Sequence, residues 1–294
     1  MTVAPYEEAG VIAVAARRLS LRDLWRRHPL AIIGGVLLLL IALMAIFAPL
    51  LTNIDPNALR PVRRLRWPSA EHWFGTDSIG RDIYSRVLYG ARVSLIVGLS
   101  VALLSTLLGL AIGLVSGFHR AVDAVVMRVM DGMMSIPPIL LAIALMALTR
   151  ASIQNVIIAI TIAEVPRVTR LVRGVVLTLR EQPFVEAARA IGTRDWRIMI
   201  RHILPNTVAP LIVQATYICA SAIITEAILS FLGAGTPPTI PSWGNIIAEG
   251  RTLFQVAAYI VIIPGLFLSV TVLAINLVGD GLRDALDPRL ARRM

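Results

Sequence analysis

Lysine is absent from this 294-residue sequence, and all 28 of its basic side chains are arginine. Charged residues make up only 16% of the chain, whereas 57% are hydrophobic. Such a composition excludes an ordinary soluble globular protein. The formal net charge of +10 could suggest a nucleic-acid-binding protein, but basic residues also concentrate beside membrane spans. We therefore expect membrane lipid as a partner and no nucleic acid.

The sequence also has few of the residues from which reactive sites are built. Cys219 is its single cysteine and lies in an apolar run, which excludes an intramolecular disulfide and a cysteine metal cluster. The four histidines are scattered, and neither a His-Glu-x-x-His pattern nor a Gly-Lys-Ser/Thr phosphate loop occurs. We therefore expect no catalytic residue, no bound metal and no cofactor in this chain.

Long apolar runs account for most of the chain, and six of them approach the roughly 20 residues needed to cross a bilayer. The predicted spans are residues 30–51, 93–118, 132–149, a run that begins near Ala151, 207–232 and 256–278. Prolines inside such spans are tolerable when neighbouring helices or water satisfy the freed backbone groups. The sequence thus predicts an all-α, polytopic membrane protein with six transmembrane helices.

An even number of spans places both termini on one side, and the arginines indicate which side. With both termini in the cytosol, 19 arginines lie inside: five in the amino-terminal tail, two between the second and third spans, eight at 167–201 and four at the carboxyl end. The loop at 60–92 holds seven of the other nine, and the positive-inside rule gives less weight to a loop of this length. The first span is too long for the apolar core of a cleavable signal peptide. The predicted organisation is a cytosolic tail at 1–29, a first span at 30–51, an extracytoplasmic loop at 52–91, a five-helix core at 92–281 and a cytosolic tail at 282–294.

A polar, arginine-bearing segment at 183–205 separates two of the apolar runs and reads PFVEAARAIGTRDWRIMIRHILP. Pro183 suits the first position of a helix, where its missing N–H costs nothing. Gly192 can take the left-handed conformation that ends a helix, and Thr193 can cap the next one. Pro205 marks the point where the second helix gives way to membrane. The pattern predicts a cytosolic helical hairpin.

This segment resembles the EAA loop of binding-protein-dependent ABC importer permeases. The residues that carry the resemblance, together with an acidic residue of the same loop, are Glu186, Ala187, Ala188, Gly192, Asp195, Leu204 and Pro205. In that family the loop docks into a cleft on the ATPase subunit, so the resemblance implies that these residues couple the chain to an ATPase. His202 departs from the general pattern, which carries isoleucine, and the variant at 202–206 resembles the dipeptide/oligopeptide/nickel branch. The alternative is an ordinary helix–turn–helix loop.

The predicted outer loop contains a second signal, HWFGTDSIGRDIYSRVLYGARVSL at 72–95. Its glycines and Asp77 are turn-forming residues, and residues 82–92 could form an amphipathic helix at the membrane interface. The stretch resembles the Gly-Thr-Asp…Gly-Arg-Asp signature of peptide and nickel permeases. Asp77, Arg81 and Asp82 are therefore candidates for a scaffold at the outer mouth that contacts the binding protein. A purely structural clamp is the alternative.

Two carboxylates are predicted within spans, where a charge at the bilayer centre costs about 2.5–3.5 kcal/mol. Glu226 lies some 20 residues beyond the start of its span, close to the outer surface, and is a candidate pore or gate residue. A structural role beside Arg251 or a neighbouring-helix hydroxyl is its alternative. Glu164 is expected to form an ion pair with Arg167.

Three arginines, Arg167, Arg170 and Arg173, recur at every third position, a spacing that also occurs in voltage sensors. They lie at the predicted cytosolic end of their span, they lead into the EAA-like loop, and no filter-like pore loop follows. We therefore interpret them as contacts to lipid phosphates or to the ATPase. A voltage-sensing channel subunit is the remote alternative.

The resemblance covers residues 30–290, including the GDGLRDALDP stretch at 279–288 that matches the peptide/nickel branch. It implies the type I ABC importer permease fold and the role of the second permease subunit of a peptide importer in the bacterial inner membrane. The implied partners are a homologous permease, two ABC ATPase subunits that bind ATP and Mg²⁺, and an extracytoplasmic binding protein. The expected cargo is a di- or oligopeptide; a nickel chelate or another small solute is the alternative.

Overall fold

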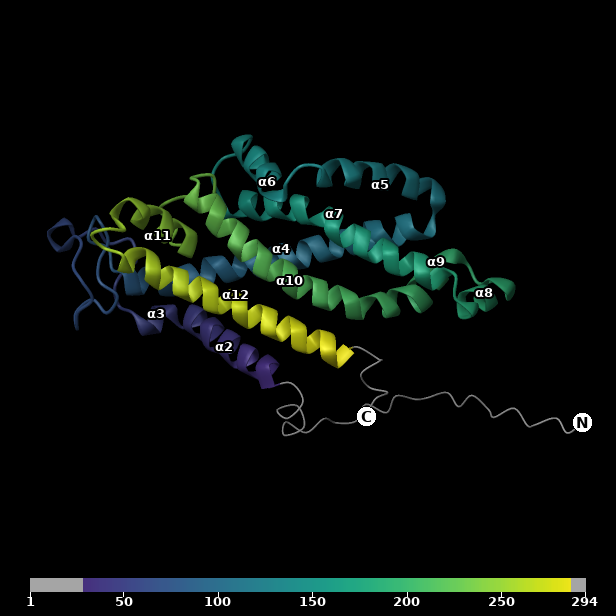
Figure 1. Cartoon of the computed structure of the whole chain (residues 1–294), viewed down its shortest axis with the longest axis horizontal. Helices are drawn as coiled ribbons and strands as arrows, with labels where there is room; N and C mark the ends of the chain where they lie inside the picture. Colours follow the sequence, from purple (N-terminus) through teal and green to yellow (C-terminus); the bar gives the residue numbers. More distant parts are fainter. Residues whose placement is uncertain (1–28, 287–294) are drawn as a thin grey trace, which may run out of the picture.

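Helices and the loops between them make up residues 29–286, the part of the chain that the computed structural model describes. Apart from one isolated bridge between Thr76 and Asp82, this part contains no strand, so the all-α prediction is confirmed. The long helices lie side by side in Figure 1. They are α2 (Pro29–Ile46), α4 (Ile83–Phe118), α7 (Ile153–Arg180), α10 (Leu204–Phe231) and α12 (Tyr259–Leu286).

The two ends of the bundle carry different kinds of structure. At one end, on the left of Figure 1, lie α3 (Ala48–Leu51), the loop at 52–82 with its short helix η1 (Pro61–Arg63), α11 (Trp243–Gly250) and η3 (Arg251–Leu253). We call this the loop end. At the opposite end lie α8 (Pro183–Ala190) and α9 (Asp195–Ile198), and we call this the hairpin end. The first and last described helices also point away from the loop end, and their far ends meet where Gly281 packs against Ala31.

Four helices in the described range are long and apolar enough to cross a bilayer. They are α2, α4, α12 and the continuous run Asp195–Phe231 that ends as α10; a fifth span results if α5 and α6 count as one broken span. The predicted fourth span corresponds to α7, which is not among them because it carries Glu164 and four arginines. The prediction of six spans is therefore confirmed only in part.

The predicted third span, 132–149, is not a single helix. The structure divides this region into α5 (Arg120–Met134) and α6 (Pro138–Ala147), which are bent by 88° relative to each other. Pro137 and Pro138 explain the break, because proline cannot donate the helical hydrogen bond and disfavours helical geometry in the residue before it. The helix also begins twelve residues earlier than predicted, at Arg120.

Three glycines let α4 and α7 approach closely. Gly109, Gly113 and Gly117 lie one turn apart on α4 and face Val168, Val172 and Val176 on α7. A Cβ atom at Gly113 would lie 2.7 Å from the Val172 Cβ, a separation that real side chains do not adopt. Small residues at this spacing favour helix association in a membrane, where close packing rather than the hydrophobic effect holds helices together.

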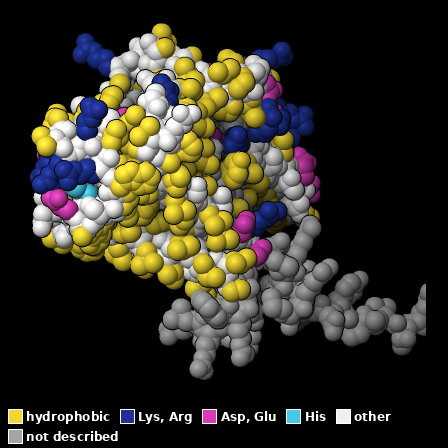
Figure 2. All heavy atoms as spheres, turned by 60° about the vertical axis from the view of Figure 1, so that its left-hand side comes forward, with side chains coloured by type: hydrophobic (Ala, Val, Ile, Leu, Met, Phe, Trp, Pro, Cys, Tyr) yellow, Lys and Arg dark blue, Asp and Glu magenta, His cyan; other side chains and the backbone are white. Residues whose placement is uncertain are grey.

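The surface of the bundle is apolar where the helices are long. Figure 2 shows hydrophobic side chains over much of the visible face, with charged side chains gathered toward its edges. Leu99 and Leu103 of α4 and Leu266 of α12 are each about 60% exposed. Exposed apolar surface on this scale indicates contact with a membrane or another protein.

Candidate functional site

In the hairpin at 183–205, a proline and a glycine set the start and the end of the first helix. Pro183 occupies the first position of α8, and Gly192, with φ of +79°, ends the helix. The amides of Gly192 and Thr193 close the last turn by donating to Arg189 O and Ala188 O over 2.9 and 3.0 Å. The predicted helix start and the predicted left-handed glycine are both confirmed.

Two details of the predicted hairpin are wrong. Thr193 does not cap α9; Arg194 precedes the helix and forms no side-chain cap. Pro205 does not separate two helices either, because α9 continues through the π-helical turn η2 (Met199–Ile203) into α10. The π turn shifts the backbone hydrogen-bond register directly before Pro205, which has no N–H to donate.

The hairpin has a buried face and an exposed face. Val185, Ala188 and Ile198 are buried, so they anchor both short helices to the bundle. Glu186, Ala187, Gly192, Asp195 and Pro205 are exposed, and Leu204 is half-buried. Large apolar side chains surround the exposed candidates: Ile191 is 82% exposed, and Phe184, Trp196 and Ile200 are also exposed. The hairpin therefore presents a group of exposed large apolar side chains among charged ones, and an exposed apolar patch rimmed by polar residues indicates an interaction site.

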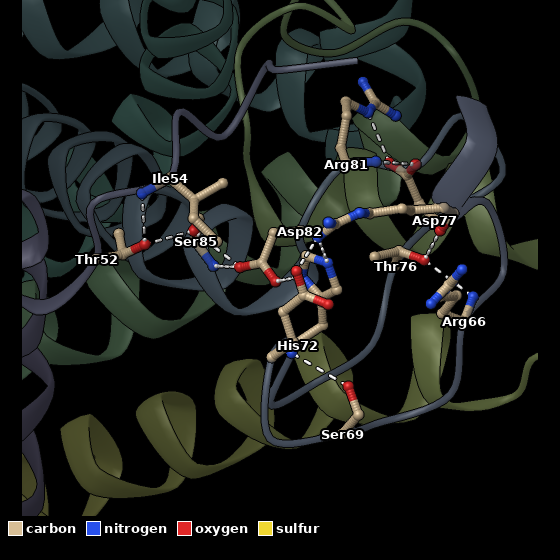
Figure 3. Close-up of polar contacts among 12 residues, drawn as sticks. Thr52, Ile54, Arg66, Ser69, His72, Thr76, Asp77, Arg81, Asp82 and Ser85 are labelled. Atoms are coloured by element: carbon tan, nitrogen blue, oxygen red, sulfur yellow. Dashed lines mark hydrogen bonds and ion pairs between the residues drawn. The ribbon is translucent and has the colours of Figure 1, made fainter. Parts of the chain in front are cut away.

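A cluster of charges, three of them buried and one half-buried, organises the loop end (Figure 3). Asp77 accepts hydrogen bonds from Arg81 Nε at 2.6 Å and from Arg86 Nη1 at 2.8 Å, and also from the amides of Ile79 and Arg81. Glu249 of α11 pairs with both arginines, and its Oε2 lies 2.5 Å from Arg86 Nη1. Two arginines and two carboxylates thus balance in charge. We call these four residues the clamp.

A second set of bonds surrounds Asp82, which caps α4. Its Oδ2 accepts from the amide and the hydroxyl of Ser85, each at 2.8 Å, and its Oδ1 lies 2.9 Å from His72 Nδ1. The Ser85 hydroxyl lies 2.6 Å from the Thr52 hydroxyl, which ties the far side of the loop to the same helix. At the margin of the loop, a hydrogen bond from Arg63 lowers the pKa of the exposed Glu71 carboxyl.

The structure brings the predicted residues Asp77, Arg81 and Asp82 together and joins them to partners that were not predicted. Residues 82–92 are not a separate interfacial helix: α4 begins at Ile83 and continues unbroken to Phe118. Arg86, which lies within this stretch, is 0% exposed because it lies in the clamp. The arrangement is that of a structural clamp that fastens the loop to α4 and α11.

Glu226 lies enclosed between α10 and α11, with 0% of its surface exposed. Its Oε1 accepts a hydrogen bond from Ser230 at 2.8 Å and lies 3.4 Å from the Thr236 hydroxyl, which Asn245 of α11 also contacts. Arg251 is not its partner; that side chain donates to Phe231 O. Of the two structural alternatives, the arginine contact is wrong, and the hydroxyls that Glu226 contacts belong to its own helix and to the loop before α11 rather than to a neighbouring helix.

The arginines of α7 are paired with carboxylates. Arg167 lies 3.1 Å from the Glu164 carboxylate, as predicted. Arg170 Nη2 donates to Asp131 at 2.6 Å, and Arg173 forms a bidentate contact with Asp123. Both aspartates belong to α5, so the arginine ladder fastens α5 along α7.

Comparison with known proteins assigns this helical bundle to a protein family. Residues 93–292 match the family described as binding-protein-dependent transport system inner membrane component. The chain belongs to this family. Residues 21–68 of the permease also match the N-terminal TM domain of oligopeptide transport permease C.

Similar proteins extend over nearly the whole permease. The probable peptide ABC transporter permease protein y4tQ of Sinorhizobium fredii is 55% identical over 268 residues, which cover 91% of this chain and 92% of that protein. The dipeptide transport system permease protein DppC of Alkalihalophilus pseudofirmus is 45% identical and covers 97% and 94%. The glutathione transport system permease protein GsiD of Escherichia coli is 42% identical and covers 90% and 88%.

A solved structure shares the fold. One crystal form of the inward-facing MetNI methionine ABC transporter aligns with a TM-score of 0.56 at 22% identity, covering 69% of the permease and 96% of that chain. The permease is therefore a multi-pass inner-membrane component with the fold of an ABC importer permease.

Sequence reasoning missed Arg86, Glu249, Asp123 and Asp131. The eight-residue spacing of the two aspartates places both on one face of a helix, and that signal could have paired them with the α7 ladder. No local signal links Arg86 to Glu249. In the described range, no cluster of three or more His, Cys, Asp or Glu side chains could hold a metal ion.

Proposed function

We propose that the permease is a membrane subunit of an ATP-driven importer for di- or oligopeptides and works beside a homologous permease. The observation that carries this proposal is the exposed hairpin, which matches the EAA loop in a chain of this family. The names of the relatives, which specify peptide, dipeptide and glutathione transport, favour a peptide cargo over a nickel chelate. An extracytoplasmic binding protein would deliver the cargo.

In the proposed topology α2, α4, the broken pair α5–α6, α7, α10 and α12 form six crossings with both termini in the cytosol. Three features support it: residues 167–201, which lead into and include the hairpin, hold eight of the arginines; the far ends of α2 and α12 lie together; and α7 pairs its charges with α5. Single cysteines at the exposed positions Ser78 and Asp195, placed in a Cys219→Ser background, test this topology. An impermeant maleimide applied to intact cells should label Ser78→Cys only. Labelling of Asp195→Cys alone would reverse the orientation.

The hairpin would couple ATP hydrolysis on the partner subunits to transport. The chain has no phosphate-binding loop, so ATP and Mg²⁺ would bind to two partner ATPase subunits. In the proposed role, Glu186, Ala187, Ala188, Gly192, Asp195, Leu204 and Pro205 form or support the surface that the ATPase contacts. The helix Asp195–Phe231 is 37 residues long and would span about 55 Å. Closure of the ATPases would move this continuous helix.

The far end of that helix carries Glu226, whose contacts join α10 to α11 and, through Glu249, to the clamp. We propose that Glu226 supports the outer gate from within the protein, because it is enclosed and does not line an exposed wall. Asp77, Arg81 and Asp82 would hold the outer mouth in the shape that receives the binding protein. Movement of the hairpin would thereby reach the outer mouth through one continuous helix.

Substitutions at Gly192 test the coupling role. A Cβ at this position meets no atom within 4 Å, so any defect arises from the positive φ or from a partner surface. Gly192→Val should abolish peptide uptake and peptide-stimulated ATP hydrolysis in nanodiscs, because β-branched residues do not tolerate this conformation. Gly192→Asn should retain more activity, since asparagine tolerates left-handed backbone.

The control is Gly174→Val, at a helical position that is equally open. It should assemble and transport like the unaltered protein. If Gly192→Val also shows unaltered ATPase co-purification, stimulated hydrolysis and uptake, the hairpin is not the coupling element.

A further inference from the structure

A groove runs along α4 at membrane depth and is not explained by peptide transport. It consists of two adjoining cavities of about 510 and 450 Å³, which share Ala42 of α2 and Leu95 and Leu99 of α4. We call it the α2–α4 groove. Helices α2 and α4 touch near the loop end and diverge toward the hairpin end, where α10 and α12 form the groove floor (Figure 1).

The groove is apolar over most of its length and is open to the surroundings. From Arg92 to Thr106 it follows α4 for about 21 Å at 1.5 Å per residue. This length exceeds the roughly 15 Å depth of one leaflet, which is half of a hydrocarbon core of about 30 Å. Leu99 and Leu103 stand on the exposed side of α4, with 61% and 60% of their surface accessible. A flexible hydrocarbon chain therefore has both room and access.

A cationic group lies at the loop end of this groove. Arg92 lines the cavity, and its guanidinium lies 5.6 Å from the ring centre of Tyr89, one turn earlier on α4. One Nη atom donates to the carbonyl of Ile46, the last residue of α2, at 3.2 Å. Since α2 is about 27 Å long, its end lies near the edge of the hydrocarbon core. Arg92 thus lies at the depth of the lipid headgroups, where tyrosine is also favoured.

We propose that the α2–α4 groove binds a phospholipid from the leaflet on the loop side, with one acyl chain in the groove and the phosphate on Arg92. Guanidinium groups bind phosphate through paired hydrogen bonds, and Arg92 has further N–H donors besides the one bound to Ile46. The acyl chain gains little from leaving the bilayer, because lipid tails are as apolar as the groove walls. Arg92 must therefore supply most of the preference for this site, while the groove shape selects a chain.

Photo-crosslinking tests the proposal on the assembled importer in nanodiscs that contain a trace of phosphatidylglycerol with a diazirine in one acyl chain. We expect adducts on residues 95–106 at a higher yield than around the exposed α12 residues Leu266 and Leu273. Arg92→Gln should lower the yield on 95–106 by roughly tenfold, the effect of losing one charge-assisted hydrogen bond. Arg92→Lys should restore part of the yield, because it keeps the charge.

Filling the groove gives an independent measurement. Ala42→Phe places a ring where the two cavities join and should remove the adducts while leaving Arg92 in place. Matched controls are Val36→Phe, at an exposed α2 position outside the groove, and Arg64→Gln, which removes an exposed charge from the loop. Neither should change the yield. A second probe, phosphatidylethanolamine with the same diazirine, should also label 95–106 if the phosphate is the recognised group.

Three results would overturn the proposal. Equal labelling of 95–106 and of the α12 positions would mean that the groove holds only bulk lipid. Labelling that persists in both Arg92→Gln and Ala42→Phe would remove the site from this groove. Absence of lipid adducts, together with disulfide formation between Leu99→Cys and another subunit, would show that protein occupies it. If a variant fails to assemble, the comparison of 95–106 with the α12 positions in the unaltered protein still decides.

Discussion

Removal of one charge from the clamp should loosen the whole loop at 52–82. Asp77 is 1% exposed and holds Arg81 and Arg86, while Arg86 has no exposed surface. Asp77→Asn preserves the shape and one acceptor for the backbone amides but leaves two arginines with Glu249 alone. The clamp then carries an uncompensated buried positive charge.

The magnitude follows from that burial. Breaking a buried ion pair by removing one partner costs about 3–5 kcal/mol. A Coulomb energy of roughly 5 kcal/mol results for charges about 3 Å apart at an effective dielectric constant of 20, which agrees in scale. If the loop opens locally, this cost raises the open population by about two to four orders of magnitude.

Trypsin provides the assay, because the loop contains exposed arginines at Arg60, Arg64 and Arg66. The purified complex would be digested briefly, and cleavage after Arg64 and Arg66 would be followed by mass spectrometry. Trypsin should cleave the Asp77→Asn variant far faster than the unaltered protein. Asp55→Asn is the matched control, since Asp55 is exposed in the same loop and its carboxylate accepts a bond from the Asn57 amide. We expect an effect within about 0.5 kcal/mol.

A double substitution checks the cause. Arg86→Gln removes the surplus charge from the Asp77→Asn protein, so the cleavage rate should return part of the way toward its original value. Cleavage of Asp77→Asn at the unaltered rate would refute the clamp as the element that holds this loop.

Three further predictions concern the remaining contacts. Gly113→Ile should lower the thermal stability of the complex by about 1–3 kcal/mol through overpacking against Val172, and Val172→Ala should recover part of it; equal melting temperatures would contradict close α4–α7 packing. Glu226→Gln keeps an acceptor for the neighbouring hydroxyls, so the complex should assemble normally while peptide uptake falls; unchanged uptake at several pH values would leave Glu226 with a structural role only. Arg173→Gln breaks the partly exposed pair with Asp123 and should speed tryptic cleavage on α5 by about fivefold, or roughly 1 kcal/mol; an unchanged rate would mean that the pair does not hold α5.

The hairpin was largely predictable because its main signals are local. Pro183 and Gly192 act on their own backbone, so their effects do not depend on distant residues. Thr193 was assigned the wrong role because the second helix begins one residue later than predicted, so that Arg194 occupies the cap position. The π turn before Pro205 replaces α-helical backbone hydrogen bonds by π-helical ones, and packing decides between these two registers.

The loop end was predictable only in part. The turn-forming residues at 75–82 marked a structured loop, and Asp77, Arg81 and Asp82 were recognised as its centre. Arg86 was not recognised as part of this cluster, because the pattern at 82–92 is also that of an amphipathic surface helix. Its contact with Glu249 spans 163 residues, a separation at which no periodicity or spacing in the sequence applies.

Composition and periodicity by themselves determined the all-helical membrane class, the approximate spans, the hairpin and the absence of a phosphate-binding loop. These properties depend on the solvent that each residue prefers and on short-range backbone geometry, both of which a linear sequence records. Only the tertiary structure decided that α5 lies along the α7 arginines, that Glu249 closes the clamp and that α2 diverges from α4 beside Arg92. Each of these features depends on which helix faces meet, and that depends on the packing of the whole bundle.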